Sequence, residues 1–115
     1  MPNDYKADWG VVVEEAKAMG GVLGEVMKAY GGLSKTVMAD GTLDRKTKEL
    51  IALGIGIGRM CDGCIMSHVR GALKNGATKE QIAETAAVAV MMSGGPGTVY
   101  GAKAIAAAEQ FAQPQ

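Results

Sequence analysis

Aromatic residues and net charge are both scarce in this chain. Its 115 residues include one Trp, one Phe and three Tyr, and twelve Lys and Arg residues are balanced by twelve Asp and Glu residues. A neutral chain generates no overall field that would attract a nucleic acid or an anionic membrane surface. So few rings also leave little surface for stacking on bases. The composition therefore argues against nucleic-acid binding.

Long apolar runs are absent as well. No stretch reaches the length of a membrane span without a charge or a glycine, and the first residues, Met1–Lys6, are polar. These features predict a soluble, cytoplasmic protein without a membrane partner. At this length we expect one domain, residues 1–115, so a functional site has to be built from the core elements themselves.

Cysteine and histidine are rare, and they occur together. Both cysteines and the only histidine lie in the eight-residue segment Cys61–His68. In a helix, Cys61, Cys64 and His68 would share one face, and the cysteines would be close enough for a disulfide. In a reducing cytosol such a disulfide is transient and serves catalysis or sensing. The isolated C-x-x-C pair therefore indicates redox chemistry; the alternatives are two buried structural thiols or a zinc site with a fourth ligand from elsewhere.

The hydrophobic periodicity is helical throughout and predicts an all-α protein of about six helices. Glycine pairs and capping residues divide the chain. We expect helices at about 4–19, 22–30, 44–58, 61–75, 78–92 and 98–112, with a short helical turn at 33–38. The expected breaks are Gly20-Gly21, Gly31-Gly32 and Gly94–Gly97.

The predicted helix at 78–92 is apolar on nearly all sides. Between Ile82 and Met92 only Glu84 and Thr85 are polar. A surface helix of a small domain needs one apolar stripe, and a chain this short hides little surface. We therefore expect protomers to bury these faces in a homo-oligomer. The alternative is a central helix wrapped by the other five.

Gly54-Ile55-Gly56-Ile57-Gly58 is not a phosphate-binding loop, because Arg59 stands where G-x-G-x-x-G requires a glycine and no strand precedes it. Each glycine inside a helix costs about 1 kcal/mol relative to alanine. Close approach of a neighbouring backbone would offset that cost. We interpret Gly54 and Gly58 as a seam of small residues for helix packing.

The reactivity of the two cysteines is shaped by opposing effects. Unpaired N–H groups in the first turn of their helix favour thiolates, whereas the carboxylate of Asp62 disfavours further negative charge. The sequence alone leaves open which cysteine is the more acidic. His68 lies one turn beyond Cys64 and is suited to carry protons near neutral pH.

Glu49 is a further candidate base if its side chain points inward. It stands where the helix at 44–58 turns apolar, directly before Leu50 and Ile51. Periodicity alone predicts instead that Glu49 is solvated, like Lys46 and Lys48.

The segment Leu43–Ile51, followed by Cys61-x-x-Cys64-x-x-x-His68 and by Gly76-Ala77-Thr78-x-x-x-Ile82, resembles the carboxymuconolactone decarboxylase family, in particular its AhpD-like alkylhydroperoxidase branch. The resemblance covers about residues 43–92. It implies an all-helical protomer that forms trimers or hexamers and reduces a hydroperoxide with a cysteine pair. A dithiol carrier or thioredoxin-like reductant would regenerate the pair, with no cofactor and no metal.

The resemblance also implies a role for each site residue. Cys64 would attack the peroxide, and Cys61 would supply a proton and then close the disulfide, while Glu49 and His68 relay protons. The start of the helix would favour Cys61 as the exposed nucleophile. Following the family, we expect a deeper Cys64 that shares a face with His68, and an exposed Cys61 that meets the carrier.

Two departures from AhpD are visible. AhpD has a second histidine between its cysteines where this chain has Gly63, and this chain is shorter, matching only the cysteine-bearing half. The alternative functions are a carboxymuconolactone decarboxylase-type lyase and a zinc-binding interaction module. True decarboxylases do not depend on a C-x-x-C pair, and the sequence shows no cluster of arginines to hold a dicarboxylate.

Overall fold

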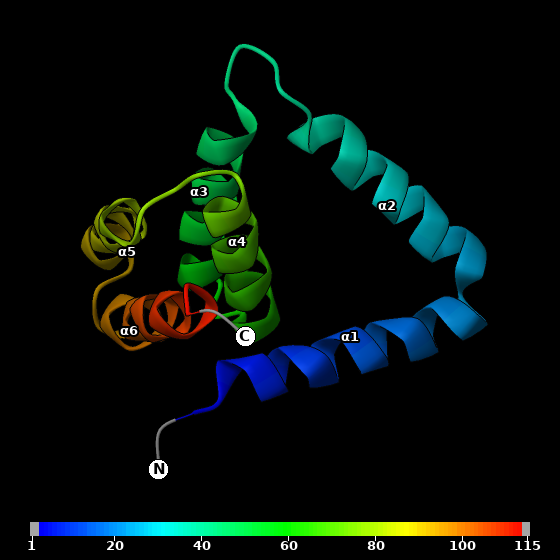
Figure 1. Ribbon diagram of the computed structural model, residues 1–115, viewed down its shortest axis with the longest axis horizontal. Coiled ribbons are helices and arrows are strands. Elements are labelled where there is room, and N and C mark those ends of the chain that lie inside the picture. The colour runs from blue at the N-terminus through cyan, green and yellow to red at the C-terminus, as the bar shows by residue number, and fades with distance from the viewer. Residues whose placement is uncertain (1–2, 114–115) are drawn as a thin grey trace.

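Six helices and no strand make up residues 3–113, the part of the chain that the computed structural model describes. The helices are α1 (Tyr5–Val22), α2 (Gly24–Met38), α3 (Arg45–Gly58), α4 (Asp62–Lys74), α5 (Lys79–Ser93) and α6 (Gly95–Phe111). The predicted all-α class is therefore confirmed. Figure 1 shows α3 to α6 gathered on one side, while α1 and α2 form an arm that leads away and returns.

Two helix starts are set by capping residues. The side chain of Asp44 accepts a hydrogen bond of 2.8 Å from the backbone N–H of Thr47. Hydrogen bonding from the side chain and backbone of Thr47 lowers the pKa of Asp44 from its ordinary 3.8, so this cap weakens only as the pH falls through the lowered value. Thr78 and Gln81 form a reciprocal capping box at the start of α5.

Two of the predicted glycine breaks are wrong. Helix α1 continues through Gly20-Gly21 to Val22, and α2 continues through Gly31-Gly32. A glycine in a helix interior lowers helix stability by about 1 kcal/mol relative to alanine. The turns on either side of a glycine pair can still hold it in one continuous helix. The chain bends instead at Leu23, whose N–H closes the last turn of α1 on the carbonyl of Met19.

The third predicted break, Gly94–Gly97, is correct only at Gly94, because the next three residues are already helical. Gly94 has φ 67°, a left-handed conformation that favours glycine, and α6 begins directly afterwards at Gly95 rather than near Thr98. Pro96 is tolerated there because the first turn of a helix needs no N–H donor.

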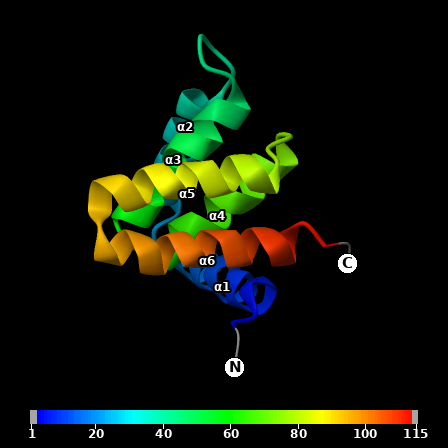
Figure 2. The same ribbon diagram turned by 90° about the vertical axis from the view of Figure 1, so that its left-hand side faces the viewer.

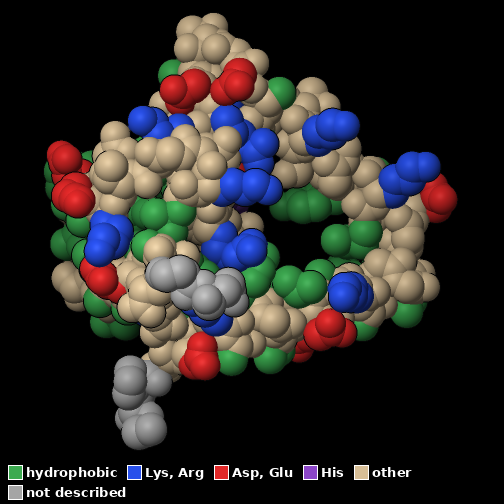
Figure 3. Space-filling model, in the orientation of Figure 1, with side chains coloured by type: hydrophobic (Ala, Val, Ile, Leu, Met, Phe, Trp, Pro, Cys, Tyr) green, Lys and Arg blue, Asp and Glu red, His purple; other side chains and the backbone are tan. Residues whose placement is uncertain are grey.

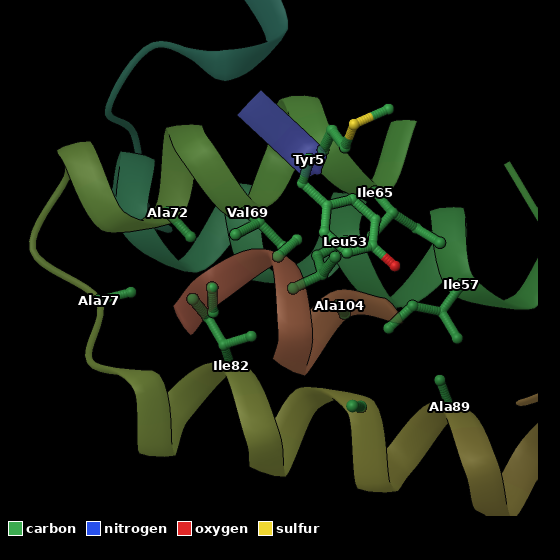
Figure 4. Packing of buried hydrophobic residues seen from close by; sticks show 14 residues of the cluster. Tyr5, Leu53, Ile57, Ile65, Val69, Ala72, Ala77, Ile82, Ala89 and Ala104 are labelled. Atoms are coloured by element: carbon green, nitrogen blue, oxygen red, sulfur yellow. The ribbon is translucent and has the colours of Figure 1, made fainter. Parts of the chain in front are cut away.

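The hydrophobic core lies between α3, α4, α5 and α6, with the start of α1 against it (Figure 4). Helices α5 and α6 run side by side (Figure 2), and Gly97 allows their close approach, because a Cβ there would lie 2.9 Å from the carbonyl oxygen of Ala89. The backbone N–H of Tyr5 donates to the side chain of Gln110 at 2.7 Å, which ties α1 to α6. The buried apolar residues are Tyr5, Leu53, Ile57, Ile65, Met66, Val69, Ala72, Ala77, Ile82, Ala86, Ala89, Ala104, Ala107 and Ala108.

Helix α2 buries none of its residues within the protomer. It contacts only α1 and α3 among the described helices, and Figure 3 shows an opening between the arm and the rest of the molecule. The amine of Lys48 holds the end of α2 by donating to the carbonyls of Val37 and Ala39 at 2.8 and 2.7 Å. The α2 stripe, as we call it, consists of the exposed apolar side chains of α2 and of its N-cap residue Leu23: Leu23, Val26, Tyr30, Leu33 and Val37.

Helix α5 is not wrapped by the other five, so the central-helix alternative is wrong. Ile82, Ala86 and Ala89 are buried against α3 and α6, but the opposite side is open. Val88 and Met92 are 59% and 76% exposed. The protomer therefore buries only part of the apolar surface of this helix.

No helix in residues 3–113 combines the length and the apolar character needed to cross a membrane.

Candidate redox site

The two cysteines stand at the start of α4 and form a disulfide. Cys61 is the N-cap residue, and its sulfur accepts the backbone N–H of Cys64 at 3.2 Å. Their Cα atoms are 5.2 Å apart, a separation that a disulfide bridges readily. The proximity predicted from the three-residue spacing is confirmed.

The turn between α3 and α4 brings the cysteines against the end of α3. Met60 adopts φ 56°, which is unusual for a residue other than glycine, and the N–H of Cys61 donates to the carbonyl of Gly56 at 3.1 Å. A Cβ atom at Gly56 would lie 3.2 Å from the Cβ of Cys64. Gly56 therefore allows the close approach of α3 to the cysteine turn.

The predicted seam of small residues lies on α3, on the side that faces α5. A Cβ at Gly54 would meet Thr85 at 3.6 Å, and one at Gly58 would meet the hydroxyl of Ser93 at 3.4 Å. Gly54 and Gly58 therefore face α5, whereas Gly56, which the glycine pattern did not single out, is the one that contacts the cysteines.

Glu49 is buried at 3% exposure, so the prediction from periodicity that it is solvated is wrong. Its Oε1 lies 2.7 Å from Nδ1 of His68, and its Oε2 accepts a hydrogen bond of 3.1 Å from Nε of Arg45. The inward position inferred from the family resemblance is the one observed. Arg45 was missed, although its spacing of four residues from Glu49 on one helix was a visible signal.

The Glu49 carboxylate also determines which ring nitrogen of His68 carries a proton. A carboxylate paired with an always-charged guanidinium can only accept hydrogen bonds, so Nδ1 of His68 carries a proton and donates it. Nε2 is then the free basic nitrogen of the ring. Gly71 on α4 makes room for the carboxylate, because a Cβ at that position would overlap it.

Both sulfurs and His68 open onto one cavity of about 320 Å³, which we call the cysteine cavity. His68 links this cavity to the buried Glu49 behind it. Arg59, whose role could not be seen from the glycine motif beside it, adds a positive charge to the lining that favours a thiolate. The lining residues are Ala52, Ile55, Gly56, Arg59, Cys61, Cys64 and His68.

The relative depth of the two cysteines is the reverse of our expectation. In the protomer Cys64 is exposed and Cys61 is half-buried. Cys61 is the N-cap residue and its N–H is bonded to the end of α3, so it sits in the turn. Cys64 lies one turn into α4 and is open to solvent. The more exposed cysteine is therefore Cys64, which lies one helical turn before His68.

Among the described residues, no three Cys, His, Asp or Glu side chains are grouped so that they could hold a metal ion.

A second cavity, of about 660 Å³, lies on the other side of Glu49. We call it the basic cavity because Lys6, Arg45, Arg70 and Lys74 line it. The sequence shows no cluster of arginines, but the fold places Arg45 of α3 and Arg70 of α4 on the lining of this one cavity.

This arrangement of helices is that of a known family. Residues 24–109 match the carboxymuconolactone decarboxylase family. The chain is 37% identical over 106 residues to an uncharacterized protein of Cupriavidus necator, covering 92% of this chain and 94% of that protein. The chain therefore belongs to the carboxymuconolactone decarboxylase family, which includes AhpD-like peroxidases and decarboxylases.

Solved structures of the family have the same fold. A carboxymuconolactone decarboxylase family protein from Legionella pneumophila, solved in its apo form, superimposes with a TM-score of 0.91 at 34% identity, covering 95% of this chain and 97% of that one. One from Thermotoga maritima, for which an involvement in the antioxidative response has been suggested, gives a TM-score of 0.80 at 26% identity, covering 91% and 90%.

Proposed function

We propose that this protein is a thiol-dependent oxidoreductase of the AhpD-like type, which reduces hydroperoxides with the Cys61–Cys64 pair. The observation that carries the proposal is the buried Glu49 carboxylate bonded to His68, at a cavity that both sulfurs share. A buried carboxylate and a histidine beside a cysteine pair form a chain of groups that can move protons.

The proposed reaction starts from the reduced pair. The Cys64 thiolate attacks one oxygen of the hydroperoxide, the O–O bond breaks, and the other oxygen leaves as an alcohol after taking a proton. Cys64 becomes a sulfenic acid. The Cys61 thiol then attacks the Cys64 sulfur, water leaves, and the disulfide forms. Nε2 of His68 takes the thiol proton and returns one to the departing oxygen, while Glu49 holds the ring through Nδ1.

Regeneration requires a dithiol partner, either a small dithiol carrier or a thioredoxin-like protein, which is oxidised as the pair is reduced. An attacking thiolate reaches a disulfide through its accessible sulfur, and we propose that this is the sulfur of Cys64, the more exposed cysteine of the protomer. Cys61 then leaves as the thiolate, and its place at the N-terminus of α4 stabilises that charge. We propose that this cycle takes place in the cytoplasm.

The first prediction concerns the thiol count of the folded protein. The reduced protein has two thiols. We expect about one equivalent of hydroperoxide to consume both, and a dithiol reductant to restore both, because one disulfide accounts for two electrons. Thiol titration and intact mass measure this directly. Two thiols that persist under peroxide, together with one zinc ion per protomer, would show that the site is structural.

We also propose that the protein works as a homo-oligomer, a trimer or hexamer by family resemblance. The α2 stripe and the open side of α5 are apolar and uncovered in the protomer, and such surfaces are typical of subunit interfaces. Interfaces of this kind bury helix faces that a protomer cannot cover alone.

The second prediction tests this assembly. Tyr30→Asp in the α2 stripe and Val88→Asp on α5 should each lower the solution mass toward the 11.8 kDa protomer, because a charge cannot be buried without a partner. Val90 is unsuitable for this test, since its side chain packs near Gly101 of α6. Lys28→Asp, on the opposite side of α2, is the control and should leave the mass unchanged. Light scattering measures the mass, and a wild-type monomer at micromolar concentration would contradict the assembly.

A further inference from the structure

The basic cavity gathers positive charge from three helices. Lys6 comes from α1, Arg45 from α3, and Arg70 and Lys74 from α4. Figure 3 shows Lys and Arg side chains gathered on the face over α4. Of the described residues that line the cavity, Glu49 is the one acid. Four cations and one carboxylate leave a net charge of three positive units.

This excess is local, because the whole chain has no net charge. Arg45 is paired with Glu49, but Lys6, Arg70 and Lys74 form no ion pair within residues 3–113. Like charges around one cavity repel each other and raise the local potential. An anion bound between them would remove that repulsion.

Arg70 is held in place for such a role. Its guanidinium lies 4.9 Å from the ring centre of Trp9 and 5.8 Å from that of Phe111. Contact with two ring faces orders the side chain before any ligand arrives, while its N–H groups keep their donor capacity. A preordered guanidinium loses less entropy on binding an oxyanion.

We propose that the basic cavity binds a small ligand that carries a phosphate group. A phosphate monoester has a charge of about −1.5 to −2 and three strong acceptor oxygens, which suits two guanidinium and two ammonium groups better than a single carboxylate does. The volume of about 660 Å³ leaves room for more than the phosphate itself. The proposal does not rest on the thiol chemistry, because the cysteines line the other cavity.

The sole tryptophan of the chain reports on this site. Trp9 is the only Trp, and it stacks on Arg70. An anion that binds the guanidinium of Arg70 should therefore change the fluorescence emission of Trp9. We expect inorganic phosphate and glycerol phosphate to produce a saturable change, at one site per protomer by calorimetry. Acetate at equal ionic strength should bind at least about tenfold more weakly, since it carries one charge.

Two exposed or half-exposed lysines make the test specific. Lys74→Gln and Lys6→Gln should each raise the dissociation constant for phosphate by at least about fivefold. Lys28→Gln, which removes the same charge from α2 far from the cavity lining, should leave it unchanged. Circular dichroism confirms that the variants are folded. Absence of saturable binding, equal weakening by the Lys28 variant, or acetate binding as tightly as phosphate would each overturn the proposal.

Discussion

Cys64→Ser is expected to lower the rate of reaction with hydroperoxide by on the order of a hundredfold or more, because it removes the attacking nucleophile. Cys61→Ser is expected to react at close to the wild-type rate for a single turnover and to stop at a sulfenic acid on Cys64. The two variants differ because only Cys64 is both exposed and one helical turn from His68.

Stopped-flow measurement of peroxide consumption gives the rate, and a dimedone adduct located by mass spectrometry gives the site of the sulfenic acid. Each serine variant is the control for the other, since both lose one sulfur and neither can form the disulfide. If Cys64→Ser retains the wild-type rate and the adduct appears on Cys61, attack belongs to the N-cap cysteine. The helix-terminus argument would then outweigh the resemblance.

The cysteine pair could be predicted from sequence because its geometry is local. Three residues separate Cys61 from Cys64, and the same helix carries His68, so a helical assignment alone brings them together. The cavity walls could not be predicted in this way. Arg59 and Gly56 lie beside the cysteines because the chain turns sharply at Met60. Met60 has a left-handed conformation, and because it is not a glycine, the sequence gives no signal of this turn.

The break predicted at Gly31-Gly32 conceals the apolar stripe of helix α2. The α2 stripe, Leu23, Val26, Tyr30, Leu33 and Val37, follows alternating steps of three and four residues, which marks one face of a continuous helix. A break assumed at Gly31-Gly32 divides this stripe into two short pieces. From the sequence, the expectation of an oligomer therefore rests on α5 and the last helix and leaves out α2, although α2 buries none of its residues.

Charge clusters are the features least visible in a sequence. Arg45 and Arg70 are 25 positions apart in the sequence, and they line the same cavity because α3 packs against α4. Periodicity likewise placed Glu49 on the solvated side of α3, because a glutamate beside two lysines has the composition of a solvated face. The compensating groups that allow its burial, His68 and Arg45, are apparent only once α3 and α4 are packed.

Glu49→Gln is expected to slow oxidation of the thiols by about ten- to a hundredfold, within the range that positioned proton carriers contribute. A glutamine has one acceptor oxygen where the carboxylate has two, so it cannot serve Arg45 and His68 equally. The pH profile of the rate should change as well, since His68 loses the anion that orients it. The loss of a buried hydrogen bond should lower the free energy of unfolding by about 1–3 kcal/mol.

Gly71→Ala separates this positioning effect from the chemistry of the carboxylate. It keeps Glu49 but puts a methyl group where the carboxylate lies, so it should displace Glu49 from His68 and slow oxidation in the same direction as Glu49→Gln. Alanine favours the helix by about 1 kcal/mol, so the slower rate cannot come from loss of α4. Gly10→Ala is the matched control, because its methyl group meets no neighbour within 4 Å and should leave the rate unchanged. Rates and pH profiles that stay wild-type in both Glu49→Gln and Gly71→Ala would leave Glu49 with a purely structural role.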